Sequence, residues 1–189
     1  MTPNAPDTSI LESTKSPAVA PPYFPVARHK LVIMSLATLS TYQLYWFYRN
    51  FALISARGIG GGGSAFWRAF FAPLTAHSLF AQVRLDARSR FIAVPWSAGG
   101  LAAIFFLVTI SCFMPYPWLL LAFGSVFVLL PVHATAEAVN AKEAPNAPRN
   151  DGYSMWNVLA IVLGIAVTIA GVIALREVDQ LFQQLENQL

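Results

Sequence analysis

Charged side chains are scarce in this chain. Asp, Glu, Lys and Arg make up 11% of its 189 residues, whereas a soluble domain carries about 25%, so charge is missing from long stretches. The formal net charge is only +3, and most of the arginines flank apolar segments. That placement is typical of orientation signals in membrane proteins rather than of a nucleic-acid surface. We therefore expect no nucleic-acid partner.

Cysteine is nearly absent as well. Cys112 is the only one in the chain, which excludes an intramolecular disulfide and any metal site built from several cysteines. A glycine-rich segment at residues 58–63 contains the spacing G-x-G-x-x-G, but Ser64 stands where a phosphate-binding loop needs a lysine. We interpret that segment as a flexible linker.

Long apolar runs dominate the carboxyl-terminal half. Residues 91–114, 116–136 and 155–175 contain no Asp, Glu, Lys or Arg. A helix needs about 20 apolar residues to cross a bilayer, and a soluble helix seldom stays apolar on every face for that length. The runs therefore predict an all-α integral membrane protein.

The predicted layout has one membrane domain between two tails. Residues 28–176 form the membrane domain, and we expect four transmembrane helices in it, at about residues 31–48, 92–113, 118–135 and 155–175. Residues 65–83 are long enough for a fifth span but contain Arg68 and Pro73, so they form either a poor span or a kinked helix in the membrane interface.

The two tails differ in composition. Residues 1–27 are rich in proline, serine and alanine and predict a disordered tail whose removal leaves the fold intact. Residues 177–189 place their apolar side chains on one helical face and predict a short amphipathic tail.

The distribution of basic residues leaves two orientations open. With five spans the amino terminus is cytoplasmic, and with four spans it is external. Both arrangements place the same number of basic residues on the cytoplasmic side, so the preference of basic residues for that side does not decide between them. Both place Arg84–Arg90 and Lys142–Arg149 in the cytoplasm and the carboxyl terminus outside.

Two aromatic segments carry a resemblance to a known family. The stretch Thr38–Asn50 (TLSTYQLYWFYRN) and the stretch Phe66–Phe71 (FWRAFF) resemble an uncharacterised family of small bacterial multi-pass membrane proteins, which contain a domain of unknown function with the pattern T-x-G-x-Y-x-x-Y-W-F-Y. Ser40 replaces the glycine of that pattern. The resemblance implies a multi-pass protein of the bacterial inner membrane and no particular activity.

Three groups of residues are candidates for contact with lipid or with other helices. Aromatic side chains at the end of the first predicted span form an interfacial belt: Tyr42, Tyr45, Trp46 and Tyr48. Basic side chains beside the next predicted span either bind anionic lipid headgroups or only set the orientation: Arg84, Arg88 and Arg90. Small side chains form a stripe along the last span, for packing within the chain or in a homo-oligomer: Ala160, Gly164, Thr168 and Gly171.

Residues that carry chemistry are few. His133 and Glu137 are four positions apart on one helical face, but two ligands are too few for a closed metal site. The predicted spans hold no ionisable group at their centres, which disfavours an ion-coupled transporter. We therefore expect no enzyme, no metal and no cofactor.

The sequence favours a non-enzymatic membrane protein that acts through helix packing, contact with membrane lipids, or association with a second copy or another membrane protein. The alternative is a small lipid-handling or transport protein with a polar cavity. A water-accessible cavity that contains Arg68, His77, His133 and Glu137 would favour this alternative.

Overall fold

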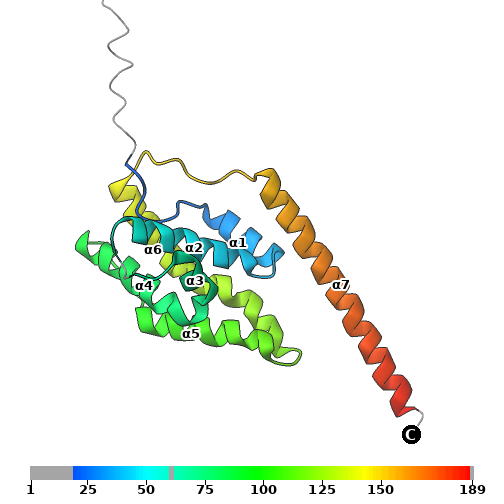
Figure 1. Cartoon of the computed structure of the whole chain (residues 1–189). Coiled ribbons are helices and arrows are strands. Elements are labelled where there is room, and N and C mark those ends of the chain that lie inside the picture. The colour runs from blue at the N-terminus through cyan, green and yellow to red at the C-terminus, as the bar shows by residue number, and fades with distance from the viewer. Residues whose placement is uncertain (1–18, 60–61, 188–189) are drawn as a thin grey trace, which may run out of the picture.

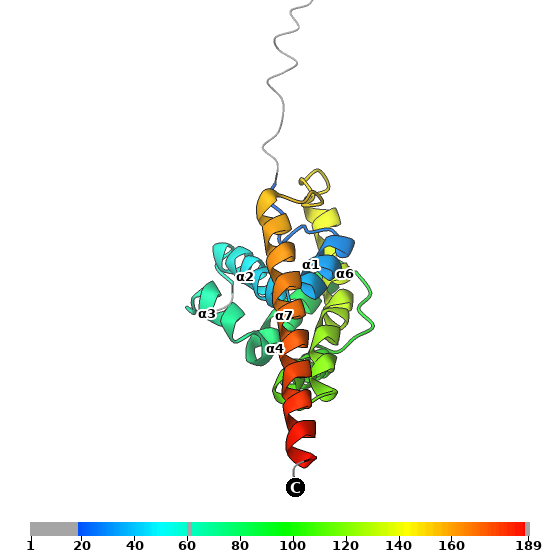
Figure 2. The same ribbon diagram turned by 90° about the vertical axis from the view of Figure 1, so that its right-hand side faces the viewer.

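The computed structural model describes residues 19–59 and 62–187, and these residues contain helices and turns but no strand. Helices α1 to α6 form a bundle, and α7 runs along one side of it and past its lower end (Figures 1 and 2). The helices are α1 (Arg28–Ala37), α2 (Thr41–Ala56), α3 (Ala65–Phe70), α4 (Ala72–Ser89), α5 (Ala98–Ile110), α6 (Ser125–Glu143) and α7 (Met155–Glu186), with 3-10 turns η2 (Ser111–Phe113) and η3 (Trp118–Gly124).

The prediction of four transmembrane helices is wrong. Among the described residues, two helical stretches are long and apolar enough to cross a membrane, Trp118–Glu143 with 26 residues and Met155–Val178 with 24 residues. The first consists of η3 and α6, and the second is most of α7. They coincide with the predicted spans at 118–135 and 155–175, whereas the predicted spans at 31–48 and 92–113 do not form.

The predicted span at 31–48 is broken by a turn. Leu39 and Ser40 have φ angles of 52° and 66°, the left-handed region that side chains other than glycine seldom adopt. Thr38 joins the two halves, because its Oγ1 donates to Met34 O at 2.7 Å and accepts from Tyr42 N at 3.0 Å. The products are α1 and α2, about 15 Å and 24 Å long, and neither reaches across a hydrocarbon core of about 30 Å.

The predicted span at 92–113 is too short. Phe91 turns the chain with a φ of 57°, and the backbone runs without helix to Ser97, whose Oγ accepts from Gly100 N and caps α5. The 13 residues of α5 rise about 20 Å. The segment 65–83 bends at Phe71, where α3 ends and α4 begins. A bend of this kind belongs to the predicted alternative of a kinked helix in the membrane interface.

The core is formed around α6. Val126, Leu129, Val132 and Val139 on this helix are fully buried, and α6 packs against α1, α4 and α5. By contrast, α7 packs chiefly against α1, and none of the residues in its apolar window is buried.

A segment without helix before α1 lies in the core. Tyr23 and Val26 are 0% exposed and Phe24 is 5% exposed. Asn140 on α6 pairs with the backbone of Tyr23 in both directions, since its Oδ1 accepts from Tyr23 N and its Nδ2 donates to Tyr23 O, each at 2.9 Å. Asn50 on α2 accepts from Phe24 N at 3.0 Å.

The loop before α7 completes this arrangement. Asn150 N donates to Pro25 O at 2.7 Å, and Val26 and Asn150 form an isolated parallel β-bridge. Buried peptide groups need such partners, and here asparagine side chains and one loop residue supply them. We name residues 21–27 the buried segment.

The buried segment corrects part of the predicted tail. Residues 1–18 lie outside the described residues, but residues 22–24, 26 and 27 are buried, so the prediction of a disordered tail does not hold for them. The expectation that removal of residues 2–26 leaves the fold intact is reversed, because the deletion takes Tyr23 and Phe24 out of the core.

We predict that Asn140→Ala destabilises the protein. The substitution leaves the buried N–H and C=O of Tyr23 without their asparagine partners, and each unpaired group costs about 1–3 kcal/mol. Thermal unfolding in detergent should show a clearly lower Tm. Asn146→Ala is the matched control, because Asn146 is exposed in the loop after α6, and equal Tm values for the two variants would contradict the role of Asn140.

Candidate functional site

Charged groups gather at one end of the bundle, where α2, α4 and α6 terminate. Asp86 on α4 is 8% exposed. Its Oδ2 accepts from Tyr23 Oη at 2.7 Å and from Arg57 Nη1 at 2.8 Å, and its Oδ1 accepts from Gln82 Nε2 at 2.8 Å. Arg57 also lies over the Tyr23 ring, 5.1 Å from its centroid, so this network anchors the buried segment a second time.

The network holds the Asp86 carboxyl in its ionised form. Burial alone would raise the pKa of Asp86, but the hydrogen bonds from Arg57, Tyr23 and Gln82 and the charge of Arg57 outweigh it and lower this pKa. Burial and the neighbouring Asp86 carboxylate raise the pKa of the Tyr23 phenol well above its usual range. Tyr23 therefore stays protonated and acts as a hydrogen-bond donor.

The predicted lipid-headgroup residues lie at the same end. Arg90 Nε pairs with Glu143 Oε1 at 2.8 Å, and Lys142 Nζ donates to Arg90 O at 2.6 Å, which joins the ends of α4 and α6. Arg84 is half-buried and Arg88 is exposed. Of the three predicted arginines, Arg88 is the one that faces outward fully.

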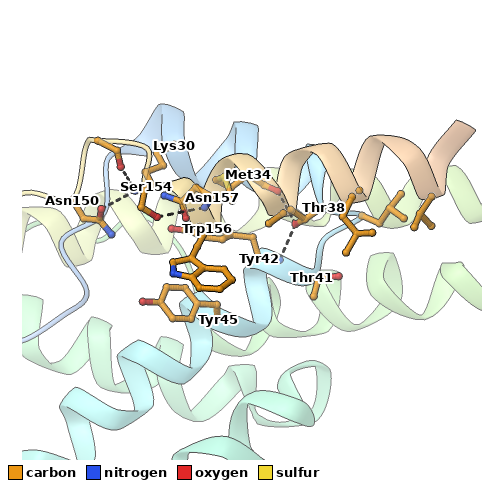
Figure 3. A pocket seen from close by; sticks show the side chains of 16 residues that line it. Lys30, Met34, Thr38, Thr41, Tyr42, Tyr45, Asn150, Ser154, Trp156 and Asn157 are labelled. Carbon is orange, nitrogen blue, oxygen red and sulfur yellow. Dashed lines mark hydrogen bonds between the residues drawn. The ribbon is translucent and has the colours of Figure 1, made fainter.

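A cavity of about 720 Å³ lies between α7 and the α1–α2 pair (Figure 3). Its polar end holds Lys30, which is 1% exposed. Lys30 Nζ donates to Asn150 Oδ1 at 2.7 Å and to Gly152 O. With the Asn157 amide oriented so that its oxygen faces Lys30, Asn157 Oδ1 accepts at 3.0 Å. The three ammonium donors thus meet neutral oxygens.

The charge of Lys30 has no carboxylate partner among the described residues within ion-pairing distance. Burial lowers the pKa of Lys30, and the more distant Asp151 offsets part of that effect. The Tyr153 ring, 5.6 Å from Nζ, provides a further weak attraction. The polar end of the cavity is therefore electropositive.

The remainder of the cavity is largely apolar. Its walls come from α1, α2 and α7 and include Met34, Tyr45, Trp156, Leu163 and Val167. Tyr42 also lines it, and this side chain is 8% exposed. Its hydroxyl is buried and has no hydrogen-bond partner among the described residues.

The Tyr42 hydroxyl is a neutral donor. Burial, with smaller contributions from Tyr45 and Tyr153, raises the pKa of Tyr42 to about 12. The phenol therefore keeps its proton at physiological pH. A buried, unpaired hydroxyl is costly unless a ligand or water pairs with it.

The predicted small-residue stripe divides between two environments. Ala160 and Gly164 line the cavity, and a Cβ built on Gly164 would lie 1.9 Å from Ala37 O at the end of α1. Thr168 Oγ1 donates to Gly164 O within α7, and Gly171 has open space around its Cβ position. Gly164 alone among the described glycines would place a Cβ this close to another helix.

The predicted aromatic belt is also divided. Tyr45 and Tyr48 are exposed, whereas Tyr42 and Trp46 are buried, Trp46 at 1% exposed. Because α2 begins only after the break at Ser40, its aromatic residues alternate between the core and the surface instead of forming one ring at a span end.

His133 and Glu137 are near one another, with 3.5 Å between Nε2 and Oε2. Among the described residues, no group of three His, Cys, Asp or Glu side chains could hold a metal ion. The cavity beside Lys30 is not lined by Arg68, His77, His133 or Glu137.

Sequence reasoning missed Lys30 and the asparagines that surround the buried segment. Lys30 is the last residue of the basic triplet Arg28–Lys30. Basic triplets of this kind commonly lie at a membrane surface, and nothing in the pattern indicates that Lys30 is buried. Asn140 and Asn150 stand in no local pattern that marks them as contacts of the buried segment. Their partners are distant along the chain, 117 residues away for Asn140 and Tyr23.

Comparison with known proteins gives no further assignment. Neither a family model, a curated protein nor a solved structure matches this chain. The resemblance to the bacterial family stays a prediction.

We predict that Asp86→Asn lowers the free energy of unfolding at pH 7 by about 1–3 kcal/mol, because it removes the charge that Arg57 and Tyr23 pair with. Since the folded pKa of Asp86 is lowered, this contribution is present above the unfolded carboxyl pKa of about 4 and is lost as the pH falls through the folded pKa. Denaturant titrations of both proteins across that range should show the difference shrinking in acid.

Glu143→Gln is the control for the Asp86 variant. Glu143 also pairs with an arginine, but its side chain is 43% exposed, so water screens the pair and the expected loss is below about 1 kcal/mol. Equal losses for the two variants would show that the buried network has no special weight.

We also predict opposite effects for two glycines of α7. Gly164→Ala forces α7 away from α1, because its Cβ would collide with Ala37 O, and it should lower Tm. Gly171→Ala meets no atom within 4 Å and should leave Tm unchanged or raise it, since alanine favours a helix by about 1 kcal/mol. The same decrease in both variants would mean that α7 does not cross α1 at Gly164.

Proposed function

We propose that this chain is a multi-pass membrane protein of the bacterial inner membrane that acts without catalysis, through contact of α7 with lipid and with a membrane-protein partner or second copy. The observation that carries the proposal is the exposure of α7. None of the 24 residues in Met155–Val178 is buried against the rest of the chain. A helix that is apolar all round and unburied needs a non-aqueous environment.

The second candidate span supports the same location. The stretch formed by η3 and α6 has 26 residues and is only 39% buried in its apolar window, so much of it faces outward. Exposed aromatic side chains on α3 and at its end extend the apolar surface: Phe66, Trp67, Phe70 and Phe71. Aromatic rings of this kind favour the boundary between lipid and water.

The position of the charges supports an orientation. Arg88, Arg90, Lys142 and Arg149 lie near the ends of α4 and α6 and in the loop that follows, joined by the Arg90–Glu143 pair. The basic excess of such loops favours the cytoplasmic side. We therefore place the loop between α6 and α7 in the cytoplasm and the end of α7 outside.

The absence of a catalytic role is part of the proposal. In the described part of the chain, Asp86, Arg57 and Tyr23 form a structural network with the buried segment, and Lys30 fastens the loop before α7. Of the Lys, Arg, Asp and Glu side chains in the described part of the chain, Lys30 and Asp86 are the buried ones, and the contacts of each hold parts of the chain together.

The direct test places a charge in the middle of α7. Ile165→Lys should reduce membrane insertion, because a central lysine costs about 2.5–3.5 kcal/mol on insertion scales, and a glycosylation-based insertion assay measures the fraction that crosses. Gln180→Lys is the control, since it adds the same charge beyond the apolar window. Equal insertion of both variants would remove α7 as a span.

The partner is tested on the same preparation. Native mass spectrometry after gentle extraction from the membrane should show protein mass beyond one chain. A chain that inserts but carries no added protein would restrict the proposed function to lipid contact.

A further inference from the structure

We propose that the cavity between α7 and the α1–α2 pair binds a single-chain amphiphile with an anionic headgroup, with the headgroup beside Lys30 and the acyl chain along α7. The inference rests on the proposed membrane location, because the bilayer supplies such molecules. It goes beyond lipid contact in general, since it assigns one defined site and one headgroup charge.

The volume and lining fit this class of ligand. A cavity of about 720 Å³ lies within the range of about 300–1,000 Å³ that sites for small molecules occupy. Such sites combine apolar walls with a few convergent polar groups. Here Met34, Leu163 and Val167 provide apolar wall, and Lys30, Asn150 and Ser154 lie at the polar end (Figure 3).

The charge at the polar end selects an anion. Lys30 is enclosed by neutral oxygens and has no carboxylate within ion-pairing distance in the described part of the chain. An enclosed charge of one sign attracts a ligand of the other more strongly than it would in water. A carboxylate or phosphate headgroup beside Lys30 supplies the missing negative charge, while the ammonium hydrogens stay with their neutral oxygens.

Tyr42 gives an independent indication of a ligand. Its side chain is 8% exposed, it lines the cavity, and its hydroxyl has no hydrogen-bond partner in the described part of the chain. The hydroxyl oxygen is fully buried in this structure, so the Tyr42 side chain would shift slightly to let an oxygen of the headgroup pair with it. The chain alone leaves that donor unused, and a bound anion satisfies it.

The acyl chain has a continuous apolar path. Val167 and Leu163 line the cavity and are also 50% and 63% exposed, so the cavity opens onto the surface of α7 that we place in the membrane. A chain that enters there moves from lipid to protein without crossing water, which keeps its apolar surface buried throughout.

The experiment uses the full chain in nanodiscs of phosphatidylcholine, a lipid without net charge. A fatty acid that carries a diazirine in mid-chain is added and photolysed, and peptide mass spectrometry locates the label. We expect labelling near Leu163 and Val167. Excess oleate should suppress it, whereas oleyl alcohol, with the same chain but no charge, and inorganic phosphate, with charge but no chain, should not.

Two variants separate binding from folding. Tyr42→Phe should weaken oleate competition about tenfold through loss of one hydrogen bond to a charged group, with Tm unchanged or higher because the unpaired hydroxyl is gone. Val167→Trp fills the cavity and should abolish specific labelling. Ile173→Trp is its control, because Ile173 is exposed on the same helix and does not line the cavity.

Each contrary result has a distinct meaning. Labelling spread along α7 and insensitive to both cavity variants would overturn the inference and leave the proposed function standing, since it would show ordinary lipid contact. Equal competition by oleyl alcohol would contradict the requirement for an anionic headgroup. Competition by phosphate would contradict the requirement for an acyl chain. Failure of the chain to enter nanodiscs would overturn the inference together with the proposed function.

Discussion

Peptide groups that are buried have to find hydrogen-bond partners, and the segment around Tyr23 and Phe24 meets this requirement without belonging to a helix or sheet. Asn140 pairs with both polar groups of the Tyr23 backbone, and Asn50 pairs with Phe24 N. These bonds connect the chain before α1 to α6 and α2, so the arrangement of the bundle depends on a segment outside it. The ionised Asp86, paired with Tyr23 and Arg57, adds α4 to the same connection.

The parts of the fold that sequence could predict are those that depend on composition alone. The stretches at 118–135 and 155–175 stay uncharged over their whole length, and both lie in helices able to cross a membrane. The break after α1 carried no such signal, because Leu39 and Ser40 take left-handed backbone angles that their residue types do not suggest. The burial of residues 21–27 could not be predicted for another reason. Their proline-rich composition indicates disorder, and the residues that bury them are distant in sequence.

In the candidate site, too, some residues could be recognised from local sequence and others only from tertiary contacts. The small residues of α7 were recognisable by spacing, and Ala160 and Gly164 do line the cavity. Lys30 was recognisable only as a basic residue, since its burial follows from the loop at 150–157 that folds over it. A charged residue at an apolar boundary is ordinarily solvated, and only the tertiary structure reveals that this one is enclosed. The local pattern therefore identified Ala160 and Gly164 only as packing positions, and the cavity that they line, with its polar end, depends on long-range contacts.

The crossing at Gly164 has a mechanical consequence. From Gly164 to Glu186 the helix extends about 33 Å, and over this length α7 contributes no buried side chain to the bundle within its apolar window. If α7 tilted by about 10° about its crossing with α1 at Ala37, its far end would move by about 6 Å. Helix tilt in a bilayer is fixed by neighbouring helices and by lipid thickness. A change of tilt at this crossing would therefore also move the first turns of α7, which follow the loop that encloses Lys30.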